Sequence, residues 1–570
     1  MDVGDLNLAC AWALVDGLVG GGVRHACVSP GSRSTPLALA LARHPAVTLH
    51  VHLDERSSAF FALGLARATG QPVVVACTSG TAAAEFLPAV VEASQSRLPM
   101  IALTADRPPR LRGTGANQTI NQVGLYGGYA RSTLDLPVPE ATGQEAWWRQ
   151  AAREVLEAAY GDPVGPAHVN CPFEEPLSPS IDIELPPPTG ESVELPARAE
   201  ADLTTEEAER LAAFASGARG AVVVGGLPGD LSAEWRLWVQ ELGWPVLAEP
   251  TSNVREPNEA LLSGQALLGD PAWIEAHRPE VVLQIGAAPT TRATQAFVAS
   301  AERLIVADRW HLDPDPERLA TWRIAVDPEA LPSALHDRPM KVVPAPDVWT
   351  EAWREADRKV RVALDDFLDG VDEPFGPRIA RDVAATIPSG GTLFVGNSTP
   401  IRDLDLAMGP RTGLHILANR GASGIDGLVS TALGIAAGGP TVAILGELSF
   451  LYDVGAFISA RRQTGDLGLV VIANGGGEIF ARLPQRSLPE HRDLFLTPHA
   501  MDIAALSRAA GATHVRVEHA ADLLPAMEDA IADGLHVVEV AVDLERSSAL
   551  RAAAVKRIAD TLAGDGPDTR

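Results

Sequence analysis

Lysine is almost absent from this 570-residue chain, which carries only Lys341, Lys359 and Lys556. None of them lies in a glycine-rich or motif-like stretch. A Schiff-base enzyme needs a lysine at its cofactor, and a Walker-type phosphate loop needs one directly after its glycines. The scarcity of lysine therefore argues against pyridoxal-phosphate chemistry, and no Walker-type loop is present.

Cysteine is rare as well. The chain has four: Cys10, Cys27, Cys77 and Cys171. They show neither metal-ligand spacing nor a disulfide framework, so we expect buried thiols in a reducing compartment. The start of the chain lacks the basic residues of a signal peptide and carries Asp2 and Asp5 instead. These features predict a cytoplasmic protein.

Positive charge is outnumbered, since 46 Lys and Arg stand against 73 Asp and Glu, for a formal charge of −27. This balance opposes non-specific binding to nucleic acid or to anionic membranes. One uncharged stretch, residues 427–446, is long enough to raise the question of a membrane span. It is interrupted by Gly438-Gly439-Pro440, and it predicts a helix, a turn and a strand in a soluble core.

Apolar strands alternating with helical segments are what the chain has in abundance. Its length predicts about three or four domains. In the first block, up to about residue 179, strands are predicted over residues 25–29, 47–52, 73–77 and 100–104, and helices over residues 36–43, 56–68 and 82–93. Such alternation indicates an α/β fold with helix-covered parallel sheets. Ligands bind such sheets beyond the carboxyl ends of the strands.

Two further blocks follow linker-like stretches at residues 186–190 and 339–346. The clearest strands of the second block are residues 221–224 and 281–285. Its Gly225-Gly226-Leu-Pro-Gly229 turn lacks the full dinucleotide fingerprint, so we interpret it as structural. A charged helix over residues 348–368 leads to the third block, with strands at residues 392–395, 415–418, 441–445 and 467–473, and with residues 535–542 closing the sheet. The domains predicted are residues 1–180, 198–336 and 372–556.

The predicted strand ends carry the residues of chemical interest. One strand of the third block ends in Gly446-Glu447-Leu448, and the next ends in Asn474 followed by three glycines. A carboxylate, an amide and close backbone approach predict a cation that carries a phosphorylated ligand. In the first block, Glu55 opens a helix beside Asp54. Helix capping alone would explain that pair, but a Gly-Thr turn and two arginine loops at other strand ends favour a functional role.

Arginines cluster in loops at predicted strand ends: Arg33, Arg107, Arg292, Arg402 and Arg420. A guanidinium binds carboxylates through two parallel hydrogen bonds, so this placement predicts a polyanionic substrate, although a single arginine is usually a surface or salt-bridging residue. The histidines form no metal-ligand spacing and are interpreted as core or surface residues: His52, His415, His491 and His499. Ser32 and Ser79 lie in no nucleophile elbow, which argues against hydrolase chemistry.

Seven stretches in order resemble one family of thiamine-diphosphate enzymes. They are residues 29–35 (SPGSRST), 52–58 (HLDERSS), 78–82 (TSGTA), 104–109 (TADRPP), 115–122 (GANQTINQ), 396–403 (GNSTPIRD) and 419–427 (NRGASGIDG). The chain resembles the MenD family, the 2-succinyl-5-enolpyruvyl-6-hydroxy-3-cyclohexene-1-carboxylate synthases of menaquinone biosynthesis. The resemblance covers most of the chain and is least in the middle block.

This resemblance implies a transferase with an N-terminal pyrimidine-binding domain, a central domain and a C-terminal diphosphate-binding domain. It implies thiamine diphosphate and a divalent metal as cofactors, with Mg²⁺ as the first choice and Mn²⁺ as the second. The reaction implied is decarboxylation of 2-oxoglutarate and addition of the resulting succinyl carbanion equivalent to isochorismate. Active sites in the family lie between subunits, so a homodimer or homotetramer is implied.

The resemblance also implies roles for individual residues. Glu55 is similar to the acid that bonds the aminopyrimidine ring and favours its imino tautomer. Residues similar to those of substrate binding and catalysis are Ser32, Arg33, Arg107, Asn117, Gln118, Arg292, Ser398, Arg402 and Arg420, with Arg292 standing where the family has lysine. Residues implied at the cofactor are Glu55, Thr78, Gly80, Thr81, Ile425, Gly446, Glu447, Leu448, Asn474, Gly476 and Ile479, with Phe480 and Leu483 lining the same pocket. The implied metal ligands are Glu447, Asn474 and Gly476.

The chain departs from the wider thiamine-diphosphate signature at the metal site. Glu447 stands where that signature has Asp, and Ala473-Asn474 stands where it has two Asn residues. Because Mg²⁺ accepts little deviation from octahedral geometry, we expect retained but weakened metal affinity. Alternatives are another thiamine-diphosphate decarboxylase or carboligase, a non-catalytic relative with a degraded metal site, and a flavin or nicotinamide oxidoreductase.

Overall fold

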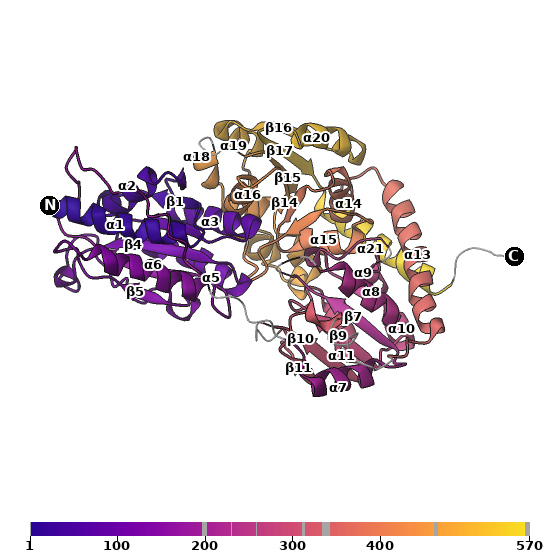
Figure 1. Ribbon diagram of the computed structural model, residues 1–570. Coiled ribbons are helices and arrows are strands. Elements are labelled where there is room, and N and C mark those ends of the chain that lie inside the picture. The colour runs from indigo at the N-terminus through magenta and orange to yellow at the C-terminus, as the bar shows by residue number, and fades with distance from the viewer. Residues whose placement is uncertain are drawn as a thin grey trace.

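The structure is a computed structural model that describes residues 2–195, 202–227, 229, 231–257, 259–309, 314–332, 342–460 and 465–564. Its strands form three sheets of six, five and six strands, and the strand pairs in all three are parallel. Figure 1 shows three bodies, each with helices around one sheet. The predicted α/β class with three parallel-sheet domains is confirmed. Lys341 and parts of the stretches 339–346 and 563–570 lie outside the described residues.

The first sheet has the strand order β2-β1-β3-β4-β6-β5. Its strands are β1 (His25–Ser29), β2 (Thr48–Val51), β3 (Val73–Cys77), β4 (Met100–Asp106), β5 (Thr133–Asp135) and β6 (Ala167–Pro172). Its helices are α1 (Val3–Gly20), α2 (Thr35–Arg43), α3 (Glu55–Thr69), α4 (Thr81–Glu85), α5 (Leu87–Ser96) and α6 (Glu145–Ala159). The single helix predicted over residues 82–93 is wrong, because Pro88 has no N–H to continue it and lies at the start of α5.

Helix α1 is long and apolar enough to cross a membrane by length and composition, but 78% of it is buried inside the fold. It packs in the first core with α6, where Leu14 and Leu18 lie beside Trp148 and Leu156. Its apolar character is thus explained by burial on all sides. The four cysteines are free and buried, as predicted.

The second sheet has the order β11-β10-β9-β7-β8. Its strands are β7 (Gly220–Val224), β8 (Val246–Ala248), β9 (Val281–Ile285), β10 (Arg303–Ala307) and β11 (Trp322–Ile324). Its helices are α7 (Thr205–Ala215), α8 (Ala233–Leu242), α9 (Gly264–Leu267), α10 (Pro271–Ala276) and α11 (Arg292–Ser300). A Cβ on Gly225 would lie 1.9 Å from the carbonyl oxygen of Ala287. This close backbone approach explains the glycine turn structurally, although its Pro228 lies outside the described residues.

The third sheet has the order β13-β12-β14-β15-β17-β16. Its strands are β12 (Thr392–Val395), β13 (His415–Leu417), β14 (Thr441–Gly446), β15 (Leu467–Ala473), β16 (Thr513–Val517) and β17 (Leu535–Ala541). Its helices are α13 (Asp347–Asp369), α14 (Gly376–Thr386), α15 (Thr399–Ala407), α16 (Leu428–Ala436), α17 (Glu447–Tyr452), α18 (Ala456–Ala460), α19 (Ile503–Ala510), α20 (Leu523–Ala530) and α21 (Leu544–Leu562). The prediction that residues 535–542 close the sheet is wrong, because β16 lies outside β17. As a mostly exposed edge strand, β16 lacks a buried apolar run.

Helices α3 and α16 join the first and third bodies, and they lie side by side in Figure 1. Phe61 of α3 and Leu428 of α16 belong to one hydrophobic core. The backbones approach so closely that a Cβ on Gly64 would lie 2.2 Å from the oxygen of Thr431. A Cβ on Gly434 would lie 2.1 Å from the oxygen of Phe61. Small residues at the crossing therefore set the relative position of the two sheets.

Candidate cofactor and substrate site

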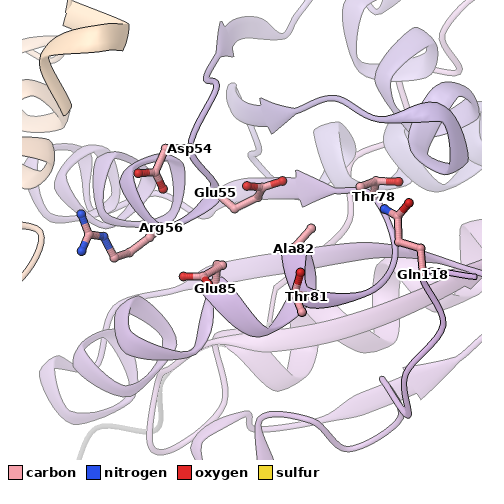
Figure 2. Close-up of a pocket in the computed structure, with 8 residues that line it drawn as sticks. All are labelled: Asp54, Glu55, Arg56, Thr78, Thr81, Ala82, Glu85 and Gln118. Carbon is pink, nitrogen blue, oxygen red and sulfur yellow. The ribbon is translucent and has the colours of Figure 1, made fainter. Parts of the chain in front are cut away.

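Asp54 and Glu55 separate into two roles at the start of α3. Asp54 caps the helix, since its carboxylate accepts the N–H of Ser57 at 3.2 Å. Glu55 instead is one of eight residues that line a pocket of about 600 Å³. Its lining residues are Asp54, Glu55, Arg56, Thr78, Thr81, Ala82, Glu85 and Gln118. In Figure 2, the Glu55 carboxyl points toward Thr78. Arg56 lies at the left end of the view and Gln118 at the right end.

The Glu55 carboxyl holds its proton more tightly than an ordinary glutamate. Burial raises its pKa, and the nearby carboxylates of Asp54 and Glu85 add to the increase against the opposing effect of a backbone hydrogen bond. A carboxyl whose pKa moves toward neutrality exchanges a proton with a bound heterocyclic base more readily. Glu55 is therefore equipped for proton exchange at this pocket.

A glycine turn with positive φ lies directly before Thr81 of the pocket lining. Gly80 has φ +88°, and a Cβ there would lie 2.8 Å from the side chain of Gln118. The buried Gln122 accepts the Gly80 N–H at 2.9 Å and donates to Asn170 at 2.9 Å. Glycine is required here by both backbone conformation and space, so the Gly-Thr turn presents Thr81 to the pocket through a fixed backbone.

The arginines of the first block are held by the protein itself. Arg107 donates to the backbone oxygen of Gln118 at 2.9 Å and also to the hydroxyl of Ser79. Arg33 is buried and donates to the oxygen of Phe173 at 2.9 Å and to Glu175 at 2.8 Å. Ser32 and Asn117 are exposed. Of the substrate residues predicted here, Gln118 alone lines the Glu55 pocket.

A second site lies at the carboxyl ends of β14 and β15 in the third body. Glu447 is buried, and its Oε1 accepts the N–H of Asn474 at 3.1 Å and the N–H of Gly476. Gly476 has φ +145°, and a Cβ there would lie 2.0 Å from the oxygen of Leu496. His499 Nε2 lies 3.3 Å from Glu447 Oε2. Burial raises the pKa of the Glu447 carboxyl.

This loop can supply hard oxygen ligands. The Glu447 carboxylate and the Asn474 amide oxygen lie together, since both accept the Gly476 N–H, the latter at 3.3 Å. One carboxylate with neutral oxygens suits Mg²⁺, which completes its shell with water and phosphate oxygens. No cluster of three or more His, Cys, Asp or Glu side chains suited to a metal occurs among the described residues. The donor set therefore fits a hard divalent cation shared with a phosphorylated ligand.

Cationic side chains gather between the second and third bodies. Burial and then the cations of Arg482 and Arg292 lower the pKa of Arg402, while Glu249 opposes this shift. Arg420 donates to Asn397 at 2.8 Å and to Thr290 at 3.3 Å. The predicted residues Arg292, Arg402 and Arg420 thus share one neighbourhood, and Ser398 belongs to it because its oxygen accepts from Arg402 at 2.5 Å. Such a cluster attracts carboxylates.

Three family models for thiamine pyrophosphate enzymes match the chain: the N-terminal binding domain over residues 9–125, the middle domain over residues 196–395 and the C-terminal binding domain over residues 406–540. The chain is 42% identical to the 2-succinyl-5-enolpyruvyl-6-hydroxy-3-cyclohexene-1-carboxylate synthase of Thermobifida fusca, covering 97% of this chain and 99% of the relative. The chain belongs to this synthase family. The synthases of Chloroflexus aurantiacus and Haloarcula marismortui are 39% and 36% identical over 93% and 99% of this chain, and 92% and 100% of their own lengths.

Membership of the synthase family explains why the two half-sites carry different donors. Thiamine diphosphate is the cofactor of these enzymes, and its ring and its diphosphate need different surroundings. The Glu55 pocket lies in the part matched by the N-terminal binding domain, and Glu447 lies in the part matched by the C-terminal one. The lining of the Glu55 pocket, taken over the described residues, comes entirely from the first body.

The cofactor residues predicted in the third body occupy varied positions. Gly446 ends β14, while Glu447 and Leu448 begin α17. Ile425 is 39% exposed, in the loop between β13 and α16. Ile479 and Phe480 lie in a short 3₁₀ helix over Glu478–Arg482, with Leu483 directly after it. Ile479, Phe480 and Leu483 thus follow the Asn474 loop directly in the chain, whereas Ile425 comes from a different loop.

Four further residues of the synthase site were not singled out by sequence patterns. Gln122 holds the Gly80 turn, and Glu478 accepts the Asn474 amide at 3.0 Å. His499, interpreted above as an ordinary core or surface residue, lies beside Glu447. Glu249 accepts hydrogen bonds from Thr290 near Arg420. Two of the four carried a usable signal: Gln122 ends the 115–122 stretch, and Glu249, like Glu447, is an acid directly after an apolar strand.

Proposed function

We propose that this chain decarboxylates 2-oxoglutarate with thiamine diphosphate and adds the succinyl unit to isochorismate, releasing CO₂. The observation that carries the proposal is the half-buried Glu55 carboxyl of raised pKa, which faces a pocket that Thr78, Thr81 and Gln118 also line. Membership of the synthase family supplies the reaction, which is named for the relatives' product.

Glu55 is the acid-base residue in this proposal. Its position fits a hydrogen bond to the aminopyrimidine ring, where it would hold or release one proton. Thiamine diphosphate, when bound, supplies the nucleophilic carbon and accepts the electrons left by loss of CO₂. Thr78, Gly80 and Thr81 would surround the ring, with Ile425 and Ile479 as apolar supports. Gly446 and Leu448 flank Glu447 at the diphosphate.

The metal would be held by Glu447, Asn474 and the Gly476 carbonyl. The support is the shared loop geometry and the hard-oxygen chemistry of these groups, which favours Mg²⁺ and also admits Mn²⁺. Glu478 fits a supporting role, because it accepts the Asn474 Nδ2 hydrogen at 3.0 Å and so directs the amide oxygen elsewhere.

The arginines would bind the carboxylates of both substrates and exclude water from them. Arg402, Arg420 and Arg292 lie in one cationic neighbourhood, which suits dicarboxylate substrates. Ser32, Arg33, Arg107, Asn117, Gln118 and Ser398 complete the proposed set from both bodies. Arg33 would have to exchange its Glu175 partner, which is largely exposed, for a substrate carboxylate.

We further propose an assembly of at least two chains, as a homodimer or homotetramer in the cytoplasm. A lining drawn from the first body alone leaves the Glu55 pocket open for a partner's diphosphate site. Residues 1–180, 198–336 and 372–556 would be the pyrimidine-binding, central and diphosphate-binding domains. Their sheets and the three family-model ranges support these limits.

The test is a coupled assay of the purified chain with 2-oxoglutarate, isochorismate, thiamine diphosphate and Mg²⁺. We expect CO₂ release and formation of the cyclohexene-carboxylate product, both dependent on the cofactor. Pyruvate serves as the comparison substrate, since a different carboligase would use it. Strong turnover of pyruvate without 2-oxoglutarate would contradict the proposal, and failure to bind thiamine diphosphate by calorimetry would favour a non-catalytic relative.

A further inference from the structure

Glu249 is a buried carboxylate at the end of β8, in the middle body. Both of its oxygens are used by one residue. Oε1 accepts the backbone N–H of Thr290, and Oε2 accepts the Thr290 hydroxyl at 3.0 Å. A buried carboxylate costs free energy unless its oxygens accept hydrogen bonds or it is paired with a cation. We therefore expect Glu249 to support a cation.

The Thr290 hydroxyl bridges Glu249 and Arg420. Arg420 Nη2 donates to the Thr290 hydroxyl oxygen at 3.3 Å, and its Nη1 donates to Asn397 at 2.8 Å. A threonine hydroxyl has one hydrogen and two lone pairs. Because the Arg420 guanidinium can only donate, it uses a lone pair of this hydroxyl, and the Thr290 hydroxyl donates its hydrogen to Glu249. The polarity of the chain Arg420 to Thr290 to Glu249 is therefore determined.

The charges around Glu249 support the same arrangement. Glu249 interacts electrostatically with two cations, Arg420 and Arg402. Asp405 of α15 is the neighbouring anion. Asp405 is itself paired with Arg255 at 3.0 Å. Burial, followed by Asp405, raises the pKa of Glu249 to about 7, while Thr290 and Arg420 oppose the increase.

We propose that Glu249 is a positioning residue for substrate recognition, which holds the guanidinium of Arg420 through Thr290 and fixes the turn that leads into Arg292. It acts without touching substrate. A strand end of the middle sheet thereby sets the geometry of arginines contributed by two bodies. The inference rests on the proposed function, because it assigns the arginines to substrate carboxylates.

The first variant is Glu249→Gln, which keeps an oxygen for the Thr290 N–H but cannot accept the hydroxyl hydrogen at its nitrogen. We expect the KM of at least one carboxylate substrate to rise about tenfold, the size expected for one lost charge-assisted hydrogen bond. The kcat and the dissociation constant for thiamine diphosphate should stay within about twofold of wild type. Glu259→Gln is the matched control, since it removes a carboxylate of the same body that binds Arg236 at 3.1 Å.

A second variant, Thr290→Val, removes the bridging hydroxyl at constant shape and should give the same rise in KM, even if Glu249→Gln does not fold. The deciding measurement is Glu249→Gln in an Arg420→Ala background, where the rise should disappear because the group being positioned is gone. An unchanged KM in both single variants, or a full effect without Arg420, would overturn the inference. A wild-type enzyme inactive on 2-oxoglutarate would instead overturn the proposed function, on which this inference depends.

Discussion

At the scale of single residues, Asp54 and Glu55 show how neighbouring carboxylates acquire different roles. Asp54 accepts the Ser57 N–H and so caps α3. Glu55, one position later, lines the pocket and has a raised pKa. The sequence left capping and a functional role open for this pair; the structure shows the cap at Asp54 and places Glu55 in the pocket lining.

Replacing Glu55 by Gln should lower turnover about a hundredfold or more, because the amide cannot exchange a proton with the cofactor ring. Binding of thiamine diphosphate should persist, since the amide still fills the same space. Steady-state kinetics and calorimetry measure the two effects. Glu85→Gln is the control, as Glu85 lines the same pocket and should leave turnover within a few-fold. A Glu55→Gln variant as active as wild type would contradict the assignment of Glu55.

Replacing Glu447 by Asp should strengthen Mg²⁺ binding a few-fold. Glu447 Oε1 accepts N–H groups of its own loop, so a cation competes with these contacts, and the shorter Asp side chain restores the length of the wider signature. Titration of Mg²⁺ into the protein with thiamine diphosphate, followed by calorimetry, gives the affinity. Glu490→Asp is a suitable control, because Glu490 is exposed in the third body. Unchanged or weaker Mg²⁺ binding would contradict the expectation that Glu447 weakens the metal affinity.

At the scale of elements, the crossing of α3 and α16 determines how the first and third bodies meet. The crossing depends on Gly64 and Gly434, whose missing Cβ atoms allow the backbones to touch. Arg56 extends this interface, with its guanidinium 3.5 Å from the buried Asp453. The helix that begins with Glu55 is thus anchored along its length, which limits movement of the pocket.

Substituting Gly434 by Ala should destabilise the fold by about 1–3 kcal/mol, the usual cost of forcing an extra carbon into a packed interior. Its Cβ would meet the backbone oxygen of Phe61 at 2.1 Å, and backbone cannot rotate away. Urea unfolding followed by circular dichroism measures the loss. Gly439→Ala is the control, since its Cβ would meet nothing within 4 Å. Equal stability of the two variants would show that the crossing has room to relax.

At the scale of the whole molecule, the residues proposed to bind the cofactor are distributed between two bodies. Glu55 lies with the first sheet, whereas Glu447 and Asn474 lie with the third. The middle body contributes Thr290 and Glu249 at the arginine cluster. A symmetric dimer could join the first body of one chain to the third of another, which makes two equal sites.

Co-expression tests this arrangement directly. Glu55→Gln and Asn474→Ala should each be nearly inactive alone, but mixed dimers contain one intact site, so activity should recover to about a quarter of wild type. Activity of the co-purified mixture is the measurement, with light scattering to establish its size. Glu55→Gln co-expressed with the double variant is the control and should stay inactive. A monomer, or a mixed dimer without recovery, would refute sites shared between chains.

The sequence by itself determined the fold class, most strands and the family. Strands β1, β3, β9, β12 and β15 are mostly buried and mostly apolar, and their limits are those predicted. The edge strand β16 escaped prediction because it buries little, and the division between α4 and α5 depends on one proline. Motif residues such as Glu55 and Asn474 were recognisable because their neighbours in the chain form part of the signal.

Only the tertiary structure decided which side chains support those residues. Gln122 reaches Gly80, His499 reaches Glu447, and Glu249 reaches Thr290. Each pair is separated by tens of residues, and no local period records the contact. Parallel sheets bring distant strand ends to one edge, and burial then decides which polar groups must find partners there. Chemistry could thus be predicted along the chain, whereas its positioning depends on packing.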